Sequence, residues 1–281
     1  MVNLELCFAI LARTGISDTE QLAIIKKVGF DGYFPCWSED MDLAALKAYG
    51  DSLGLKLQSV HAPFIKVDSL WYPNEHTQTV MARLLACLRD SAAVGAPIVV
   101  IHPFITFTRN EATVEGIENF RILVEEARNL GLKLAIENVE GEAYLDALFE
   151  AFKDESHVGF CWDTGHEMCY NRHRDLLADY GDRLFCTHIN DNLGIKDRAG
   201  EITFHDDLHL LPFDGIADWQ DIARRLKKSG YKGELTFELK WDTKLNGCDH
   251  LIYPGVSVED YITKAYLRAC RVAALVLAAD A

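Results

Sequence analysis

Gln58-Ser-Val-His61, Ile98-Val-Val-Ile-His102 and Leu134-Ala-Ile-Glu137 are short apolar runs that each end on a residue able to bind a metal or move a proton. The same pattern returns in Gly159-Phe-Cys-Trp-Asp163, Phe185-Cys-Thr-His188 and Leu235-Thr-Phe-Glu238. A strand buried on both faces stays apolar until it reaches solvent, so a polar group recurring at the same end of successive strands indicates one shared place. The sequence therefore predicts a metal-dependent active site at that end.

Apolar runs alternate with amphipathic stretches along the whole chain. The junctions Ser52-Leu-Gly-Leu-Lys-Leu57 and Asn129-Leu-Gly-Leu-Lys-Leu134 are near copies, which indicates a repeated unit, and Ser17-Asp-Thr-Glu20 has the spacing of a capping box that begins a helix. The expected strands are 4–10, 32–36, 56–61, 97–102, 133–138, 158–163, 184–189 and 234–239, followed by a last helix from about 257. Eight such repeats predict an α/β fold, a (β/α)8 TIM barrel, as a single domain over residues 1–281.

Composition narrows the classes of partner and compartment. The chain has 28 Lys and Arg against 43 Asp and Glu, a formal charge of −15, which disfavours nucleic acid as a partner. Its eight cysteines form no C-x-x-C pair and are interpreted as reduced core residues. No secretory signal is visible, and the apolar run 272–279 is too short for a membrane span. We expect a soluble, cytoplasmic protein without a membrane partner.

The principal candidate ligands are Glu137, Asp163, His188 and Glu238, which end predicted strands five to eight. Three carboxylates and one imidazole suit Mn²⁺ or Mg²⁺ with positions left for water or substrate, whereas Zn²⁺ is a second option. The alternative, several buried carboxylates with no cation beside them, would cost several kcal/mol for each charge. The set is therefore interpreted as a metal site.

Five further donors are candidates for additional metal binding or substrate binding. His61 and His102 end neighbouring strands, which favours function over the ordinary interpretation of a lone strand-end histidine as a satisfied polar residue. His166 stands three residues after Asp163, and the long segment 191–213 carries the others, Asp207 and His209. Four residues near predicted strand ends are candidate substrate contacts, although loop packing or ordinary solvation would explain them equally well: Trp37, Lys196, Arg198 and Lys240.

The motifs Trp162-Asp-Thr-Gly-His166, Thr187-His-Ile-Asn-Asp191 and His209-Leu-Leu-Pro-Phe-Asp-Gly215, with the other strand ends, resemble the xylose isomerase-like TIM barrel superfamily of sugar phosphate isomerases and epimerases. The resemblance spans nearly the whole chain. It departs at Phe213, where the usual pattern has a glycine before the acidic residue.

The resemblance implies several functions. In the superfamily's ketose 3-epimerases, the positions matching Glu137, Asp163, His188 and Glu238 bind one divalent metal, and the two glutamates form the proton-transfer pair. Other members are hydroxypyruvate isomerases, inosose dehydratases and zinc-dependent apurinic-site endonucleases. The endonucleases hold three zinc ions with positions that resemble all nine donors present here.

The leading hypothesis is a divalent-metal-dependent isomerase or ketose epimerase acting on a small sugar or sugar phosphate, with two glutamates transferring a proton through an enediolate. The alternatives are an inosose dehydratase-like lyase, a trinuclear zinc phosphoesterase, and a barrel that binds sugars without catalysis. Segment 34–42 is short and acidic, which disfavours a DNA-binding surface. The order in which Glu137 and Glu238 act, the exact substrate and the formation of a homo-oligomer stay open.

Overall fold

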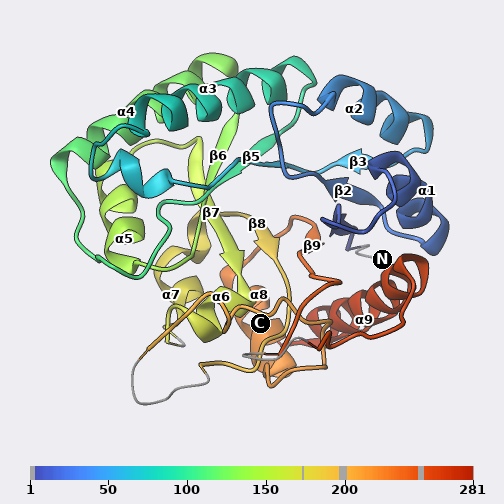
Figure 1. Ribbon diagram of the computed structural model, residues 1–281. Coiled ribbons are helices and arrows are strands. Elements are labelled where there is room, and N and C mark those ends of the chain that lie inside the picture. Colours follow the sequence, from blue (N-terminus) through green and yellow to red (C-terminus); the bar gives the residue numbers. More distant parts are fainter. Residues whose placement is uncertain (1–3, 173, 196–200, 246–249, 281) are drawn as a thin grey trace.

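The structure is a computed structural model that describes residues 4–172, 174–195, 201–245 and 250–280. Strands alternate with helices along these residues (Figure 1). The strands are β1 (Leu6–Ala9), β2 (Gly32–Phe34), β3 (Lys56–Leu57), β4 (Val60–His61), β5 (Ile98–Ile101), β6 (Lys133–Glu137), β7 (Val158–Asp163), β8 (Leu184–His188) and β9 (Leu235–Phe237). The helices are α1 (Asp18–Val28), α2 (Leu43–Ser52), α3 (Thr77–Ala93), α4 (Val114–Leu130), α5 (Glu142–Ala151), α6 (Thr164–Cys169), α7 (Leu176–Tyr180), α8 (Trp219–Ser229) and α9 (Val258–Ala278), with 3-10 turns η1 (Val67–Leu70) and η2 (Gly181–Arg183).

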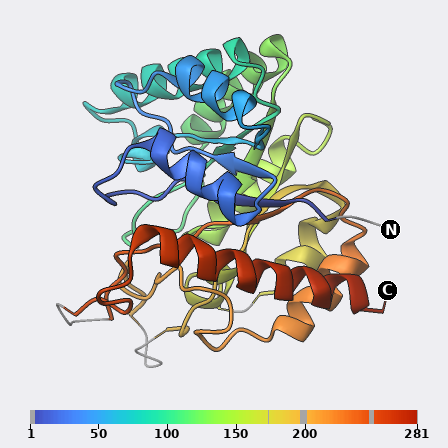
Figure 2. The same cartoon turned by 90° about the vertical axis from the view of Figure 1, so that its right-hand side faces the viewer.

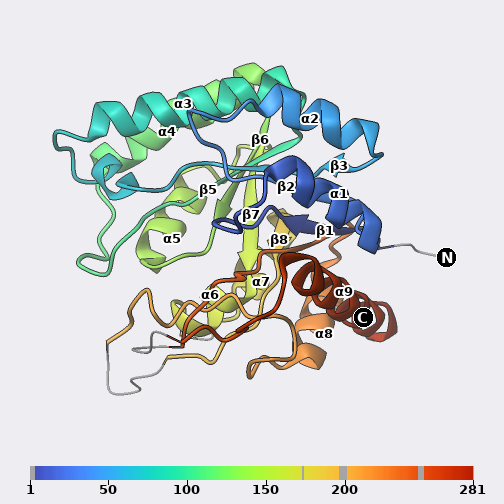
Figure 3. The same ribbon diagram turned by 45° about the vertical axis from the view of Figure 1, so that its right-hand side comes forward.

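The strands form a curled parallel sheet that closes into a barrel. Hydrogen bonds give the order β3-β2-β1-β9 and, separately, β4-β5-β6-β7-β8. The parallel bridges Cys36–His61 and Ile189–Phe237 join these two groups at both seams. Figure 3 shows the helices arranged around this sheet, with α3 and α4 packed side by side. The predicted (β/α)8 barrel is therefore confirmed.

The third predicted strand is interrupted, which the apolar pattern did not indicate. β3 pairs with β2, whereas β4 pairs with β5, so the chain changes partner between Leu57 and Val60. At the change, Gln58 N–H donates to Tyr33 O at 2.9 Å, and beyond it Ala62 N–H donates to Val100 O at 2.8 Å. The expected third strand thus pairs with β2 through its first part and with β5 through its second part, which contains His61.

The core has two layers, as a barrel requires. The larger layer lies between the sheet and the helices, and a smaller one inside the barrel consists of Ile98, Val100, Ala135, Cys161 and Cys186. Figure 2 shows α9 running beside α1, where the last helix packs next to the first. The prediction of cysteines as core residues is wrong for Cys36 and Cys270, which are exposed, and Cys248 lies outside the described residues.

Local signals in the sequence fix individual helix starts. Ser17 Oγ accepts from Glu20 N–H at 3.2 Å, and the Glu20 carboxylate accepts from Ser17 N–H at 2.8 Å, so the predicted capping box is formed. Ser257 begins α9 in the same way by accepting from Asp260 N–H. In the described part of the chain, no helix has the length and apolar character needed to cross a membrane.

Candidate metal centre

Glu137 ends β6 inside the barrel mouth and has no exposed surface. Its carboxylate oxygens lie 3.1 Å from His188 Nδ1 and 3.2 Å from His61 Nε2. His102 Nε2 and His166 Nδ1 approach the same carboxylate at 3.3 Å and 3.4 Å. Burial raises the pKa of Glu137, but the imidazoles around it outweigh that effect and leave the pKa well below its ordinary value. Glu137 is therefore a buried anion at the centre of four imidazoles.

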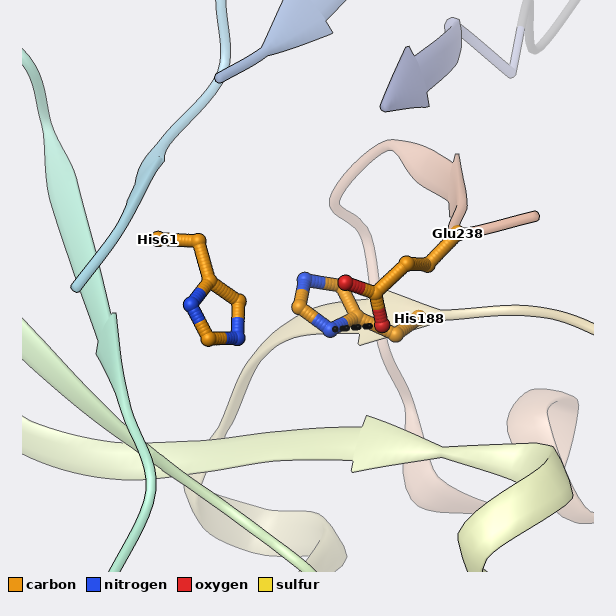
Figure 4. Close-up of side chains that lie close together, drawn as sticks. All are labelled: His61, His188 and Glu238. Atoms are coloured by element: carbon orange, nitrogen blue, oxygen red, sulfur yellow. Dashed lines mark ion pairs between the residues drawn. The ribbon is translucent and has the colours of Figure 1, made fainter. Parts of the chain in front are cut away.

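His188 connects the two predicted catalytic glutamates. Its Nδ1 is 3.2 Å from Glu238 Oε2, and the close-up in Figure 4 shows His61, His188 and Glu238 pointing toward one another. Its ring stacks on Phe34 with centroids 4.8 Å apart, which fixes the plane of the imidazole. Burial lowers the pKa of His188, yet Glu137 and Glu238 raise it well above its ordinary value. Its Nε2 is buried and has no hydrogen-bond partner among the described residues.

Asp163 is held in place by its neighbours before any ligand binds. One carboxylate oxygen accepts from His166 N–H at 2.7 Å, because Asp163 is the N-cap of α6, and the other accepts from Asn190 Nδ2 at 2.8 Å. The Asn138 amide bonds both the N–H and the C=O of Asp163. Burial raises the pKa of the Asp163 carboxyl to about 6, although His166 and His209 lower it. Its oxygens keep lone pairs that face the cluster.

Asp207 and His209 form the outer part of the cluster. His209 Nε2 is 2.9 Å from Asp207 Oδ2, and the same oxygen lies 3.5 Å from His166 Nε2. His209 Nδ1 lies 3.0 Å from the carbonyl oxygen of Glu238, which connects this segment to the end of β9. Asp207 Oδ1 is buried without a hydrogen-bond partner in the described part of the chain.

The donor atoms fit a divalent metal ion. Glu137, Asp163, His188 and Glu238 place one ligand atom each within 4.8 Å of one another. Among the described residues four further groups meet the same limit, and they include His61 with His102 and Glu137, and Asp163 with His166 and His209. Buried atoms without a partner, His188 Nε2 and Asp207 Oδ1, also need a ligand, a proton or a water. The structure thus brings all nine predicted donors together, while their role as ligands stays a prediction.

The structure describes two of the four candidate substrate contacts, Trp37 and Lys240. Trp37 is buried, and its indole N–H donates to Asp90 of α3 at 2.9 Å. Its polar edge is thus used within the barrel wall, and its role as a substrate contact stays a prediction. Lys240 lies beside the cluster, where its backbone N–H donates to the backbone carbonyl oxygen of His209 at 3.0 Å. Lys196 and Arg198 lie outside the described residues.

Sequence reasoning missed Asp191, the residue that orders the long segment after β8. Its buried carboxylate accepts from Phe213 N–H at 2.9 Å, from Ala217 N–H at 3.0 Å and from Trp219 Nε1 at 3.1 Å. Its backbone pairs with Leu210 in an antiparallel bridge. The available signal was a second polar residue soon after a strand end, in His188-Ile-Asn-Asp191.

Phe213 occupies the position where the resemblance expects glycine. It has φ 73°, in the left-handed region that glycine enters without steric cost. The ring packs against Trp219 at 5.1 Å and under the Arg271 guanidinium at 3.8 Å. Together with the bond to Asp191, these contacts hold the turn, so the loop keeps a glycine-type backbone without glycine.

Comparison with known proteins identifies the family. A model of the xylose isomerase-like TIM barrel family matches residues 22–260. The chain belongs to this family. One curated relative of this chain is the "Uncharacterized protein y4fM" of Sinorhizobium fredii. It is 35% identical over 169 residues, which are 54% of this chain and 50% of that protein. The chain thus spans about half the length of that relative.

Two solved structures have a fold similar to that of this chain. D-psicose 3-epimerase with D-tagatose, from Clostridium cellulolyticum H10, is 15% identical, with 97% of this chain and 99% of that chain covered and a TM-score of 0.73. The IOLI protein with a bound zinc atom is 18% identical, with 97% and 98% covered and a TM-score of 0.71. At these identities the likeness concerns the fold.

Replacing Asp191 by Asn should destabilise the protein by about 1–3 kcal/mol, because one acceptor oxygen becomes a donor that faces buried N–H groups. The loss is measured as the free energy of unfolding in urea. The matched control is Asp218→Asn at the N-cap of α8, where Asn caps nearly as well as Asp, so a change within about 0.5 kcal/mol is expected. Equal effects of the two substitutions would show that Asp191 does not organise the segment.

Proposed function

We propose that this protein is a divalent-metal-dependent isomerase or epimerase of a small sugar or sugar derivative, in which Glu137 and Glu238 exchange a proton with the substrate. The observation that carries the proposal is the placement of both carboxylates against one buried imidazole, with His188 Nδ1 3.1 Å from Glu137 and 3.2 Å from Glu238. Two carboxylates beside one substrate carbon are the equipment for removing a proton and returning it.

Glu137, Asp163, His188 and Glu238 would hold the ion. Their three carboxylates favour Mn²⁺ or Mg²⁺, and the imidazole also permits Zn²⁺. When bound, the ion stabilises the negative charge that develops on the substrate as a proton leaves the carbon next to the carbonyl.

The protein's own groups would perform the proton transfer. Burial raises the pKa of Glu238, but His188 outweighs it and brings the pKa to about 2, and the pKa of Glu137 is also lowered. Both glutamates are therefore ionised at neutral pH, the form in which a carboxylate accepts a proton. One removes the proton from the substrate carbon, and the other, after taking up a proton from water, delivers that proton on the opposite face for epimerisation. His61 and His102 would orient substrate oxygens from the other side of Glu137.

Glu137→Gln and Glu238→Gln should each lower turnover by at least about 10²–10⁴-fold, because the amide cannot accept the proton. The measurement is entry of solvent deuterium into ketoses, ketose phosphates and inososes, followed by NMR with Mn²⁺ or Mg²⁺ present. Glu259→Gln, at an exposed ion pair with Lys27, is the control and should retain full activity.

Two outcomes would contradict the proposal. Undiminished function of both glutamine variants, with the fold preserved, would favour a barrel that binds sugars without catalysis. Loss of water from an inosose would favour the lyase, since elimination also begins with removal of a proton beside a carbonyl.

A trinuclear zinc phosphoesterase is the second candidate, and the completeness of the donor set favours it. Asp163, His166 and His209 form one group of donor atoms, and His61, His102 and Glu137 form another, beside the set of Glu137, Asp163, His188 and Glu238. The shared carboxylates would have to serve more than one ion.

Counting the ions separates the two candidates. The isomerase proposal predicts about one tightly held ion per chain, and the variant Asp207→Asn/His209→Gln should keep it, because neither residue belongs to the set of Glu137, Asp163, His188 and Glu238. The measurement is elemental analysis of dialysed protein by mass spectrometry. About three zinc ions per chain, with loss of zinc in the double variant, would instead support the phosphoesterase.

A further inference from the structure

Glu167 is a buried carboxylate that stands beside the candidate metal centre without belonging to it. It follows His166 in the short helix α6, and 6% of its surface is exposed. His166 faces the cluster, where its Nδ1 lies 3.4 Å from Glu137. The Glu167 carboxylate instead contacts α7 and α8, which lie beside α6 in Figure 1. Among the described residues, no group of possible metal donors includes Glu167.

Arg225 of α8 pairs with Glu167 through two hydrogen bonds. Its Nη1 donates to Glu167 Oε1 at 2.6 Å, and its Nη2 donates to Oε2 at 2.9 Å. The Nε of Arg225 also donates at 2.9 Å to Asp175, the N-cap of α7. A guanidinium and a carboxylate joined by two parallel bonds keep one relative orientation. The pair therefore fixes α6 against α8, although the two residues are 58 positions apart in the sequence.

Trp162 connects the same carboxylate to the strand that carries Asp163. Its indole Nε1 donates to Glu167 Oε2 at 2.8 Å, and the guanidinium carbon of Arg225 lies 5.2 Å from the centre of its ring. Trp162 is fully buried and directly precedes Asp163 at the end of β7. The bond from Trp162 to Glu167 thus joins the two residues that flank the turn 163–166, which contains two of the predicted donors.

The turn 163–166 needs contacts from outside the helix that it begins. α6 has six residues, whereas isolated helices shorter than about 12–15 residues are marginal in water. On the side of the cluster, Asp163 accepts from His166 N–H at 2.7 Å, and the carbonyl oxygen of Asn138 lies 2.9 Å from His166 Nδ1. On the other side, Glu167 bonds to β7 and α8. The position of the turn therefore depends on contacts from both sides.

Stability alone is a weak explanation for the buried pair of Glu167 and Arg225. Taking two charges out of water is costly, and packed apolar side chains of similar volume often give an equally stable protein. What the pair adds is a defined geometry between the elements that it joins. Metal sites need such geometry, since residues outside the ligand set typically change metal affinity by about 10–100-fold when they are replaced.

We propose that Glu167 is a positioning residue of the candidate metal centre. Held by Arg225 and Trp162, it fixes the orientation of α6. That orientation sets where the Asp163 carboxylate and the His166 imidazole lie in the cluster. The proposal rests on the proposed function, because it assumes that Asp163 binds the ion. It assigns part of the control of metal affinity to residues in the barrel wall that do not touch the ion.

Binding of Mn²⁺ alone tests this role without turnover. The measurements are calorimetric titration with Mn²⁺ and the free energy of unfolding in urea without metal. Glu167→Gln should weaken Mn²⁺ binding by about tenfold or more, because one carboxylate oxygen becomes an NH2 group that faces N–H donors. Arg225→Lys is the milder variant, since lysine keeps the charge but cannot form both bonds, and it should weaken Mn²⁺ binding by a smaller factor.

Arg183→Gln is the matched control at the other end of β7. The Arg183 Nη2 donates to the carbonyl oxygens of Phe152, Glu155 and Val158, and Val158 is the first residue of β7. Loss of these bonds should lower the free energy of unfolding while the affinity for Mn²⁺ stays unchanged. The comparison separates an effect on the donors from a general loss of stability.

Unchanged Mn²⁺ affinity in both Glu167→Gln and Arg225→Lys, or an equal loss of affinity in Arg183→Gln, would overturn the positioning role. Deuterium exchange by the wild type tests the proposed function separately. Weaker Mn²⁺ binding by Glu167→Gln, with no exchange on any sugar by the wild type, would overturn the proposed function and leave the positioning role. Exchange by the wild type with unchanged Mn²⁺ affinity in both variants would do the reverse. Failure of the wild type to bind Mn²⁺ would overturn both.

Discussion

The burial of one carboxylate, that of Glu137, is the constraint on which the rest of the site depends. An anion without access to water needs cations or strong hydrogen bonds around it, since an unpaired buried charge costs several kcal/mol. The imidazoles that meet this need come from β4, from the ends of β5 and β8, and from α6. Closure of the barrel therefore assembles the site, because three strands and one helix each bring an imidazole to the same anion.

Polar residues outside the donor set hold this arrangement by bonding the backbone. Asn138 bonds the backbone of Asp163, and Asn190 bonds its carboxylate. Asp191 does the same for the long segment that presents Asp207 and His209. A metal ion would thus enter a cluster whose ligands are already fixed by the fold. Such pre-positioning favours chemistry that needs defined geometry between a carbonyl and two bases.

Much of the fold and of the site was predictable, because a buried parallel strand is a continuous apolar run in the sequence and a polar residue marks its end. Each of the eight expected strand ranges contains an observed strand, and Glu137, Asp163 and His188 end theirs. The break after Leu57 and the hydrogen bond from Trp37 to Asp90 of α3 were not predictable, because each depends on which neighbouring strand or helix the chain meets.

The central claim is that Glu137 anchors a divalent ion shared with Asp163, His188 and Glu238. Anomalous diffraction from crystals of the protein soaked in Mn²⁺ locates bound manganese directly. The account predicts the strongest anomalous peak among these four side chains, with donor atoms at about 2.0–2.3 Å from the ion. A strongest peak at Asp207 and His209 with none at Glu137, or no peak in the barrel mouth, would contradict it.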